Sequence, residues 1–409
     1  MLYNAYEVQR SLLAGASRMA GMGAGWLSNP ANPFGYGAMG PVVAAALNVF
    51  AHASTSRGKP EFGLGQAQVG KQIVPVSEDI ILKKPFGQLK HFRKHGIEGQ
   101  PKLLIVAPMS GHFATLLRGT VERMLPKHDV FITDWRDAKN VPLEQGRFDL
   151  DDYVDYLVEF LEAIKGDGKD RPHMLAVCQP SVPALAATAI MAADRNPARP
   201  ASLTMMGGPV DTRKAPTAVN TLATQRPHAW FQQNAIATVP VIYGGAGRKV
   251  YPGFLQLAGF MTMNLGNHLV SHWEMFKHLV EGDEEQAEAT RDFYDEYMSV
   301  ADMTAEFYLQ TVDVVFQRHL LPKGEYMHRG RRVDVGAIKD TALLAIEGER
   351  DDISGIGQTR AALDLAGQLP KSKKQYLMAK GVGHYGIFNG RKWREQIAPV
   401  VEKFIAANA

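Results

Sequence analysis

The alternation of short apolar runs with longer amphipathic stretches constrains the fold of this chain more than any other feature. Residues 103–107 form a continuous apolar run that ends at Pro108, which is typical of a strand buried on both faces of a sheet. Between residues 150 and 164 the apolar side chains recur at helical spacing instead. Strands that alternate with helices predict a mostly parallel sheet with right-handed crossovers.

The same pattern continues along most of the chain. Residues 80–86 and 88–92 are expected to pair as antiparallel strands ahead of the parallel sheet. The other expected strands are 103–107, 130–135, 173–177, 202–206, 343–347 and 375–378. The expected helices are 113–125, 150–164, 184–193 and a last helix with Trp393, Ile397, Val400, Val401 and Phe404.

The alternation stops between residues 211 and 335, where helix-like segments are rich in aromatic residues and methionines. We interpret 211–335 as a helical cap inserted before the last two strands, so that residues 76–210 and 336–409 form the core. Residues 1–75 are predicted to be an N-terminal helical extension. Its amphipathic segments could lie on a hydrophobic surface or pack on the protein's own core, and both alternatives stay open.

The composition of the 409 residues is ordinary for a globular protein, with 45% hydrophobic and 21% charged residues. A net charge of +3 does not favour nucleic-acid binding. A single cysteine cannot form a disulfide within the chain and is compatible with a reducing cytoplasm. The sequence shows no signal-peptide pattern and no run of about 18 apolar residues. We therefore expect a cytoplasmic protein without a transmembrane segment.

The one cysteine, Cys178, lies where an apolar strand ends and an Ala-rich helix begins. A nucleophile at the tip of such a turn is how α/β-hydrolases present their attacking atom, and their triads run nucleophile, acid, histidine along the chain. Asp351 follows the strand at 343–347, and His384 follows the strand at 375–378. Three candidate groups stand at three strand ends in that order, which predicts an α/β-hydrolase fold with these catalytic residues.

The residue types suit acyl transfer. Imidazole can take the proton of a thiol near neutral pH, and a carboxylate fixes the tautomer of the imidazole. The backbone N–H of Gln179 is one expected donor to the oxyanion, with help from the helix N-terminus behind it. The second donor is expected from Met109 or Ser110, and the sequence does not choose between them.

Some alternatives stay open at this stage. Asp352 is the second choice for the acid, since Asp351 completes a Gly-x-x-Asp turn. Ser181 is a rival nucleophile, but it would lie inside the helix. His268 and His272 share one helical face, as a pair of metal ligands would, yet no third ligand is evident nearby. Neither a metal nor another cofactor is expected.

Five motifs spread along the chain are informative together. They are Glu7-Val8-Gln9-Arg10-Ser11, Pro108-Met109-Ser110-Gly111-His112, Val177-Cys178-Gln179-Pro180-Ser181, Glu347-Gly348-Glu349-Arg350-Asp351 and Gly383-His384-Tyr385-Gly386. In these motifs the chain resembles the intracellular polyhydroxybutyrate depolymerase family. The resemblance implies that a Cys178–Asp351–His384 triad hydrolyses 3-hydroxybutyrate esters at the surface of a cytoplasmic granule.

Two details qualify the resemblance. Ala176 and Pro180 flank Cys178 at the positions where hydrolases usually have glycines, and a proline is tolerated there because the first helical turn does not need its N–H. The Gly-x-Cys-x-Gly box of the related polyester synthases is absent, which disfavours polymerisation. The Met- and aromatic-rich cap suits a weakly polar, uncharged polyester.

The expected function is therefore hydrolysis of amorphous poly(3-hydroxybutyrate) through an acyl-cysteine intermediate. Transfer of the acyl group to CoA, which would release 3-hydroxybutyryl-CoA, is one alternative, and a non-catalytic granule-coat protein is another. The expected partners are the granule surface and the polymer or its oligomers. A homodimer is compatible with the sequence.

Overall fold

The computed structural model describes residues 2–29, 32, 39–55, 57–263 and 294–409. Within these residues the chain forms a nine-stranded sheet. Its strands are β1 (Gln66–Val69), β2 (Gln72–Lys83), β3 (Gly87–Lys94), β4 (Lys102–Val106), β5 (Asp129–Trp135), β6 (His173–Val177), β7 (Ser202–Met206), β13 (Ala342–Gly348) and β14 (Lys374–Ala379).

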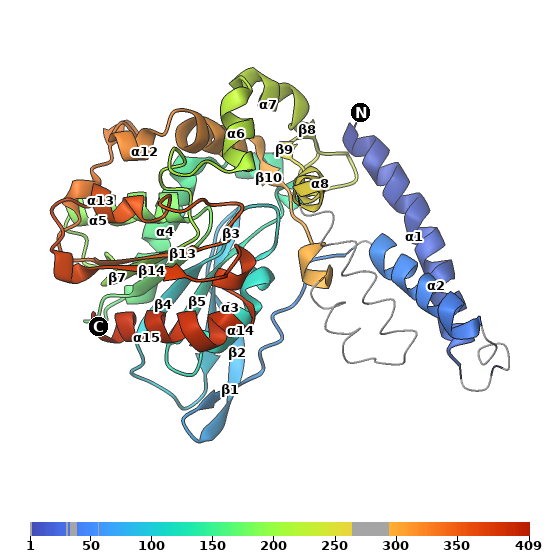
Figure 1. Cartoon of the computed structure of the whole chain (residues 1–409), viewed down its shortest axis with the longest axis horizontal. Helices are drawn as coiled ribbons and strands as arrows, with labels where there is room; N and C mark the ends of the chain where they lie inside the picture. Colours follow the sequence, from blue (N-terminus) through green and yellow to red (C-terminus); the bar gives the residue numbers. More distant parts are fainter. Residues whose placement is uncertain (1, 30–31, 33–38, 56, 264–293) are drawn as a thin grey trace.

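The sheet has the strand order β1-β2-β3-β5-β4-β6-β7-β13-β14 (Figure 1). The first three strands pair antiparallel, and β3 is also antiparallel to β5. All neighbours from β5 to β14 are parallel. The order and the directions are those of the α/β-hydrolase fold, so the predicted fold class is confirmed.

The central strands are apolar because both of their faces are covered. Every residue of β6, β7 and β13 is buried. A parallel strand in this position cannot alternate between a wet and a dry face, which explains the continuous apolar runs in the sequence. The predicted strands at 173–177 and 202–206 agree with the structure to the residue, and those at 343–347 and 375–378 are one residue short at each end.

Helices pack on both faces of the sheet (Figure 1). α4 (Leu150–Lys165) and α5 (Ser181–Ala193) contact each other on one face, and α3 (Arg118–Met124) and α15 (Ala398–Ala406) contact each other on the other face. α4 starts with a capping box in which Asp149 and Asp152 each accept the other's backbone N–H. Shorter helical segments of the core are η2 (Ala114–Leu117), α13 (Ala361–Leu365), η8 (Tyr385–Ile387), α14 (Gly390–Lys392) and the π-helical turn η9 (Trp393–Ile397).

The segment predicted as a helical cap contains short strands as well as helices. Its helices are α6 (Ala218–Gln225), α7 (His228–Asn234), α8 (Gly253–Met263), α11 (Ala305–Thr311) with the π-helical turn η5 (Val312–Gln317), and α12 (Leu320–Lys323). Its strands are β8 (Ala237–Thr238), β9 (Lys249–Tyr251), β10 (Met303–Thr304), β11 (Met327–His328) and β12 (Arg331–Arg332). β8, β9 and β10 form a small sheet, which the purely helical interpretation missed because strands of two or three residues show no periodicity.

The N-terminal part begins with a pair of packed helices, α1 (Leu2–Leu27) and α2 (Gly40–Ser54), which stand beside the body of the molecule (Figure 1). The glycines and alanines of α1 let α2 approach closely, and a side chain at Gly23 would crowd Leu47 of α2. The predicted extension of 1–75 was too long as a helical unit, since β1 and the start of β2 already belong to the main sheet. Among the described residues, no helix is long and apolar enough to cross a membrane.

From the packing of the core we expect two leucines to contribute very differently to the free energy of unfolding. Leu344 in β13 is completely buried, whereas the side chain of Leu143 is 54% exposed. Leu344→Ala should lower the free energy of unfolding by about 2–5 kcal/mol, because it leaves a cavity between the sheet and its helices. Leu143→Ala should change it by about 0.5 kcal/mol or less. Urea unfolding of both variants checks this, and equal losses would contradict the placement of β13 in the core.

Candidate active site

Cys178 lies at the sharp turn between β6 and α5. Its backbone φ is +66°, a left-handed conformation that is uncommon for a residue with a side chain. The turn is held by two backbone hydrogen bonds, from the Cys178 N–H to the carbonyl of Met206 (2.7 Å) and from the Ser181 N–H to the carbonyl of Cys178 (3.0 Å). This geometry raises the partly buried thiol above the carboxyl ends of the parallel strands.

Two glycines after β7 make room for this turn. Any side chain at Gly208 would overlap Ser181 at the start of α5. A Cβ at Gly207 would lie 3.2 Å from both Asp351 Oδ2 and His384 Cε1. Glycines are therefore required where the sheet, the cysteine turn and the acid–imidazole pair come together, and a Gly-Gly pair at a strand end was the sequence signal for it.

His384 follows β14 and lies between an acid and the thiol. Its Nδ1 is 2.8 Å from Asp351 Oδ2, and both side chains are buried. Cys178 lies close enough to the same imidazole to influence its pKa. Burial alone would lower the pKa of His384, but the adjacent Cys178 and Asp351 outweigh it and raise that pKa well above its usual value. The imidazole is thus set up as a strong proton acceptor.

The structure distinguishes the two neighbouring aspartates. The Oδ1 atom of Asp351 accepts the backbone N–H groups of Ile353 (2.9 Å) and Ser354 (2.8 Å), so its Oδ2 is directed at His384. Asp352 is exposed at the surface. Asp351 is consequently the acid that the fold brings to the imidazole, which agrees with the order of preference drawn from the sequence.

A second buried acid, Glu347 at the end of β13, shapes the loop that carries Asp351. Its carboxylate accepts the backbone N–H groups of Gly357, Thr359 and Arg360, each at 2.8 or 2.9 Å, and the hydroxyl of Tyr376. A carboxylate that collects several donors replaces the water it loses on burial. Glu347 is thus a structural acid that fixes the path of the loop, whereas the acid hydrogen-bonded to His384 in the described part of the chain is Asp351.

One predicted oxyanion donor, the Met109 N–H, lies beside the side chain of Gln179, the residue that carries the other predicted donor. The backbone N–H of Met109 points at residue 179 and donates to the Gln179 side-chain oxygen at 3.3 Å. The backbone of Gln179 itself lies at the start of α5, directly after Cys178. Between the alternatives left open, the geometry favours Met109 over Ser110. The Oε1 atom of Gln179 marks a position near Cys178 where an oxygen can accept from this loop.

His112 has a structural role in the same loop. Its Nε2 lies 3.0 Å from the carbonyl of Tyr297, and burial lowers its pKa to about 4, so the ring is neutral at physiological pH. The Ala301 N–H donates to the carbonyl of Gly111 at 2.7 Å. These contacts fasten the Met109 loop to the cap segment before β10. The rival nucleophile Ser181 is completely buried within the first turn of α5, where no substrate could reach its hydroxyl.

Two tyrosines near the thiol were not foreseen from the sequence. The ring of Tyr385 packs edge-on against that of Tyr297 in the cap, with ring centres 5.8 Å apart. Burial, then Tyr297, then the nearby Cys178 raise the pKa of Tyr385, so its hydroxyl stays protonated and can donate. Tyr385 could have been noticed as the neighbour of His384, but Tyr297 is far away in sequence. The His268 and His272 pair lies outside the described residues.

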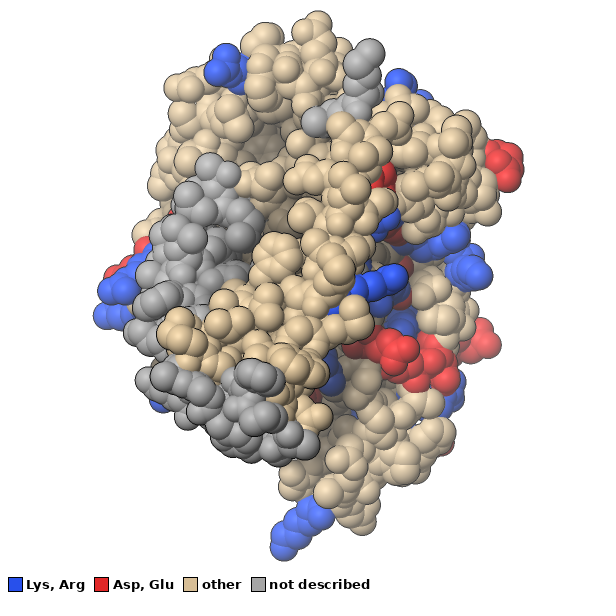
Figure 2. Space-filling model, turned by 90° about the vertical axis from the view of Figure 1, so that its right-hand side faces the viewer, with Lys and Arg blue, Asp and Glu red and all other residues tan. Residues whose placement is uncertain are grey.

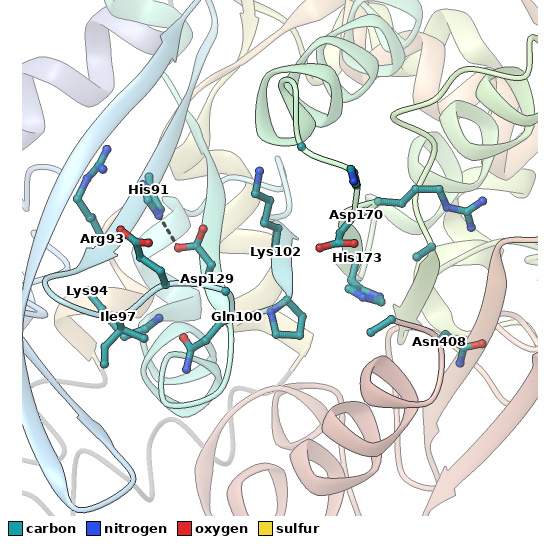
Figure 3. Close-up of a pocket in the computed structure, with 18 of the residues that line it drawn as sticks. His91, Arg93, Lys94, Ile97, Gln100, Lys102, Asp129, Asp170, His173 and Asn408 are labelled. Carbon is teal, nitrogen blue, oxygen red and sulfur yellow. Dashed lines mark hydrogen bonds and ion pairs between the residues drawn. The ribbon is translucent and has the colours of Figure 1, made fainter.

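A cavity of about 820 Å³ lies at the opposite end of the sheet, where β4, β5 and β6 begin (Figure 3). Two of its polar contacts lie within the protein: His91 Nε2 is 2.6 Å from Asp129 Oδ1, and Lys102 Nζ donates to the carbonyl of Ile164 at 2.7 Å. None of the predicted site residues lines it. This cavity is therefore separate from the Cys178 site.

Comparison with known proteins places the C-terminal half of the chain in a family. Residues 207–409 match the family model described as PHB de-polymerase C-terminus, where PHB is polyhydroxybutyrate. The matched region contains Asp351 and His384, and Cys178 lies before it. The family supports ester hydrolysis as the activity. No curated protein matches the chain.

Solved structures with a similar arrangement are hydrolases of low sequence identity. Naproxen esterase from Bacillus subtilis is 14% identical, with 82% of this chain and 92% of that chain covered at a TM-score of 0.43. The 2-hydroxy-6-oxo-6-phenylhexa-2,4-dienoate hydrolase of a Rhodococcus species is 14% identical, with 81% of this chain and 99% of that chain covered at a TM-score of 0.44. The monoacylglycerol lipase of Paleococcus ferrophilus is 11% identical, with 76% of this chain and 97% of that chain covered at a TM-score of 0.44. Likenesses this distant do not bear on the activity of the chain.

From the geometry of the site we expect the reactivity of the Cys178 thiol to depend on Asp351. In Asp351→Asn the new amide would keep the N–H groups of Ile353 and Ser354 on its oxygen and turn its NH₂ toward His384. The imidazole would then hold its proton on the side of Cys178 and could not accept another one. Alkylation of Cys178 by iodoacetamide at neutral pH should slow by at least about tenfold.

Asp352→Asn is the matched control, since it removes the same charge one residue away from an exposed position. The rate at which iodoacetamide alkylates Cys178 in this variant should stay within about twofold of the rate in the unaltered protein, because surface charges act weakly through water. Equal slowing in both variants would mean that overall charge, and not the contact with His384, governs the thiol.

Proposed function

Because the chain belongs through residues 207–409 to the PHB depolymerase family, we propose that it hydrolyses amorphous poly(3-hydroxybutyrate) on cytoplasmic storage granules through an acyl-cysteine intermediate. The observation that carries the proposal is the buried hydrogen bond between Asp351 and His384, with the partly buried Cys178 near the same imidazole. The three side chains come from loops after three parallel strands, where ligands of such sheets bind. Their types and order suit covalent acyl transfer.

In this mechanism His384 first accepts the proton of the Cys178 thiol. The thiolate attacks the carbonyl carbon of an ester unit, a C–S bond forms, and the π electrons of the carbonyl move to its oxygen. The intermediate then collapses, the C–O bond to the leaving alcohol breaks, and His384 gives its proton to that oxygen. Asp351 keeps the imidazole in the required tautomer and stabilises its charged form.

The second half of the reaction releases the acid. Water loses a proton to His384 and attacks the thioester carbon, and the C–S bond breaks as the free carboxylic acid forms. The proton on His384 returns to the sulfur, so the protein is regenerated without any co-reactant other than water. The two halves use the same imidazole, which explains why one histidine is sufficient.

The negative oxygen of each tetrahedral intermediate needs fixed donors. We assign this role to the backbone N–H groups of Gln179 and Met109. The Gln179 side-chain oxygen now accepts from the Met109 N–H, and a substrate oxygen would take its place. The contacts of Gly111 and His112 with the cap keep this loop in position while the substrate binds.

A polyester of short hydroxy acids carries no charge, so its recognition depends on apolar and weakly polar contacts. Beside His384 lie the rings of Tyr385 and Phe388, each with its centre 5.9 Å from the imidazole. Tyr297 contributes a further ring from the cap. These side chains would cover the ester unit next to the thiol, and the Tyr385 hydroxyl can donate to an ester oxygen.

The direct test is release of soluble 3-hydroxybutyrate species from amorphous polyester granules, with and without CoA. The unaltered protein should release them without CoA, and Cys178→Ala should lower the rate by at least about 10³-fold because the nucleophile is lost. If product appears only with CoA, and as a CoA thioester, the reaction is thiolysis and not hydrolysis. Undiminished release by Cys178→Ala would rule out the proposed nucleophile.

A further inference from the structure

The outward side of α1 carries a continuous apolar stripe. Its members are Val8, Leu12, Gly15, Met19 and Met22, spaced four, three, four and three residues apart, so that they lie along one side of the helix. The exposed fractions of these residues are 62% for Val8, 73% for Leu12, 67% for Met19 and 68% for Met22. Single exposed apolar residues are normal on a protein surface, but a contiguous row of them marks an interaction site.

The opposite side of α1 is fixed to the rest of the protein. The Tyr3 hydroxyl donates to Asp302 Oδ2 at 2.6 Å, and the Tyr243 hydroxyl donates to Glu7 Oε1 at 2.9 Å. Further along, the Ser17 hydroxyl donates to the carbonyl of Ala51 in α2 at 2.8 Å. These contacts set the rotation of the helix, so the stripe cannot turn inward to bury itself.

A second apolar row starts at the N-cap of the neighbouring helix α2 and continues along that helix. Met39, Val43, Ala46 and Phe50 repeat the spacing of four, three and four residues, and all four are exposed. The exposed fractions are 65% for Met39, 41% for Val43 and 44% for Phe50. α1 and α2 pack side by side (Figure 1), and we call their two apolar rows together the apolar face of the helical pair.

This face has very little charge. Within residues 2–29 and 39–55 the only Asp, Glu, Lys or Arg side chains are Glu7, Arg10 and Arg18. Glu7 and Arg10 bind each other and Tyr243. Figure 2 looks at the side of the molecule that carries α1 and α2, and most of the helical surface in its centre is free of blue and red atoms. Arg18 is thus the one exposed charge along α1 that these internal contacts do not use.

The lack of charge narrows the choice of partner. A helix that pairs with another helix in one register normally has charged residues beside its apolar seam. An amphipathic helix that binds an anionic membrane carries several Lys or Arg residues on its polar face. α1 and α2 have neither, and flexible methionines on the stripe adapt to an irregular apolar surface. The complement of this face is a surface that is aliphatic, weakly polar and uncharged.

We propose that the apolar face of α1 and α2 docks the protein on the surface of the solid aliphatic polyester, which rests on the proposed function for the identity of that polymer. The face is distinct from the Cys178 site, and the two would act on the same polymer in different ways. Docking through α1 holds the protein at the granule, and single chain segments reach the thiol separately. Loss of the docking face should therefore spare the hydrolysis of small soluble esters.

The test uses a full-length double variant, Leu12→Glu with Met19→Glu, which puts two charges on the stripe. Sedimentation with protein-free amorphous polyester granules should show at least roughly tenfold weaker binding, since two large apolar contacts are lost. The rate on granules should fall in parallel. The rate on the soluble dimer ester of 3-hydroxybutyrate should stay within about twofold, because the variant leaves the Cys178 site untouched.

The matched control is Ile73→Glu with Met327→Glu, which changes two exposed apolar residues outside α1 and α2 (69% and 47% exposed). It should bind granules like the unaltered protein, and thermal unfolding should confirm that both double variants are folded. Because binding is measured apart from turnover, an inactive protein that still binds through the stripe would contradict the proposed function and support the docking face.

Three outcomes would overturn the docking proposal. One is granule binding by the stripe variant equal to that of the control. Another is a dimer in analytical ultracentrifugation that the stripe variant alone converts to monomer while granule binding persists, which would make the face a contact between two copies. The third is stronger binding to phosphatidylglycerol vesicles than to the polyester, which would assign the face to lipid.

Discussion

The hydrogen bond between Asp351 and His384 is the contact on which the rest of the site depends. It joins the loops after β13 and β14 at 2.8 Å and is buried, so that water does not weaken it. Around it the packing is tight, because a Cβ at Gly207 would crowd both Asp351 and His384. Glu347 fixes the loop of the acid by accepting three backbone N–H groups. The pair in turn sets the orientation of the imidazole toward Cys178.

Features of the structure that depend on neighbouring residues could be predicted from the sequence, and those that depend on contacts between distant segments could not. Strands such as β6 and β7 were predicted to the residue, because burial on both faces requires a continuous apolar run. Cys178, Asp351 and His384 could be chosen because each lies in the loop after a predicted strand. The contact of Met109 with Gln179 could not be predicted, since it joins side chain and backbone across loops that are 70 residues apart.

Other features depend on tertiary packing that no local pattern reveals. The small sheet of β8, β9 and β10 joins residues 237 to 304 through strands of two or three residues. The sequence left open whether the N-terminal segment packs on its own core or faces outward. In the structure α1 does both: Tyr3 is buried against Asp302, while Leu12 and Met19 face outward. One contact network connects the two regions, because Asp302 follows Ala301, which holds the Met109 loop through Gly111.

The central claim is that the substrate acyl group passes through Cys178, and the most direct measurement is to trap it there. The protein would be mixed with excess soluble oligomer, quenched in acid during turnover and digested for mass spectrometry. If the acyl group passes through Cys178, the peptide with Cys178 should carry a hydroxybutyryl group that neutral hydroxylamine removes, as expected of a thioester. An acyl group that resists hydroxylamine, or that is found on Ser181, would contradict the account.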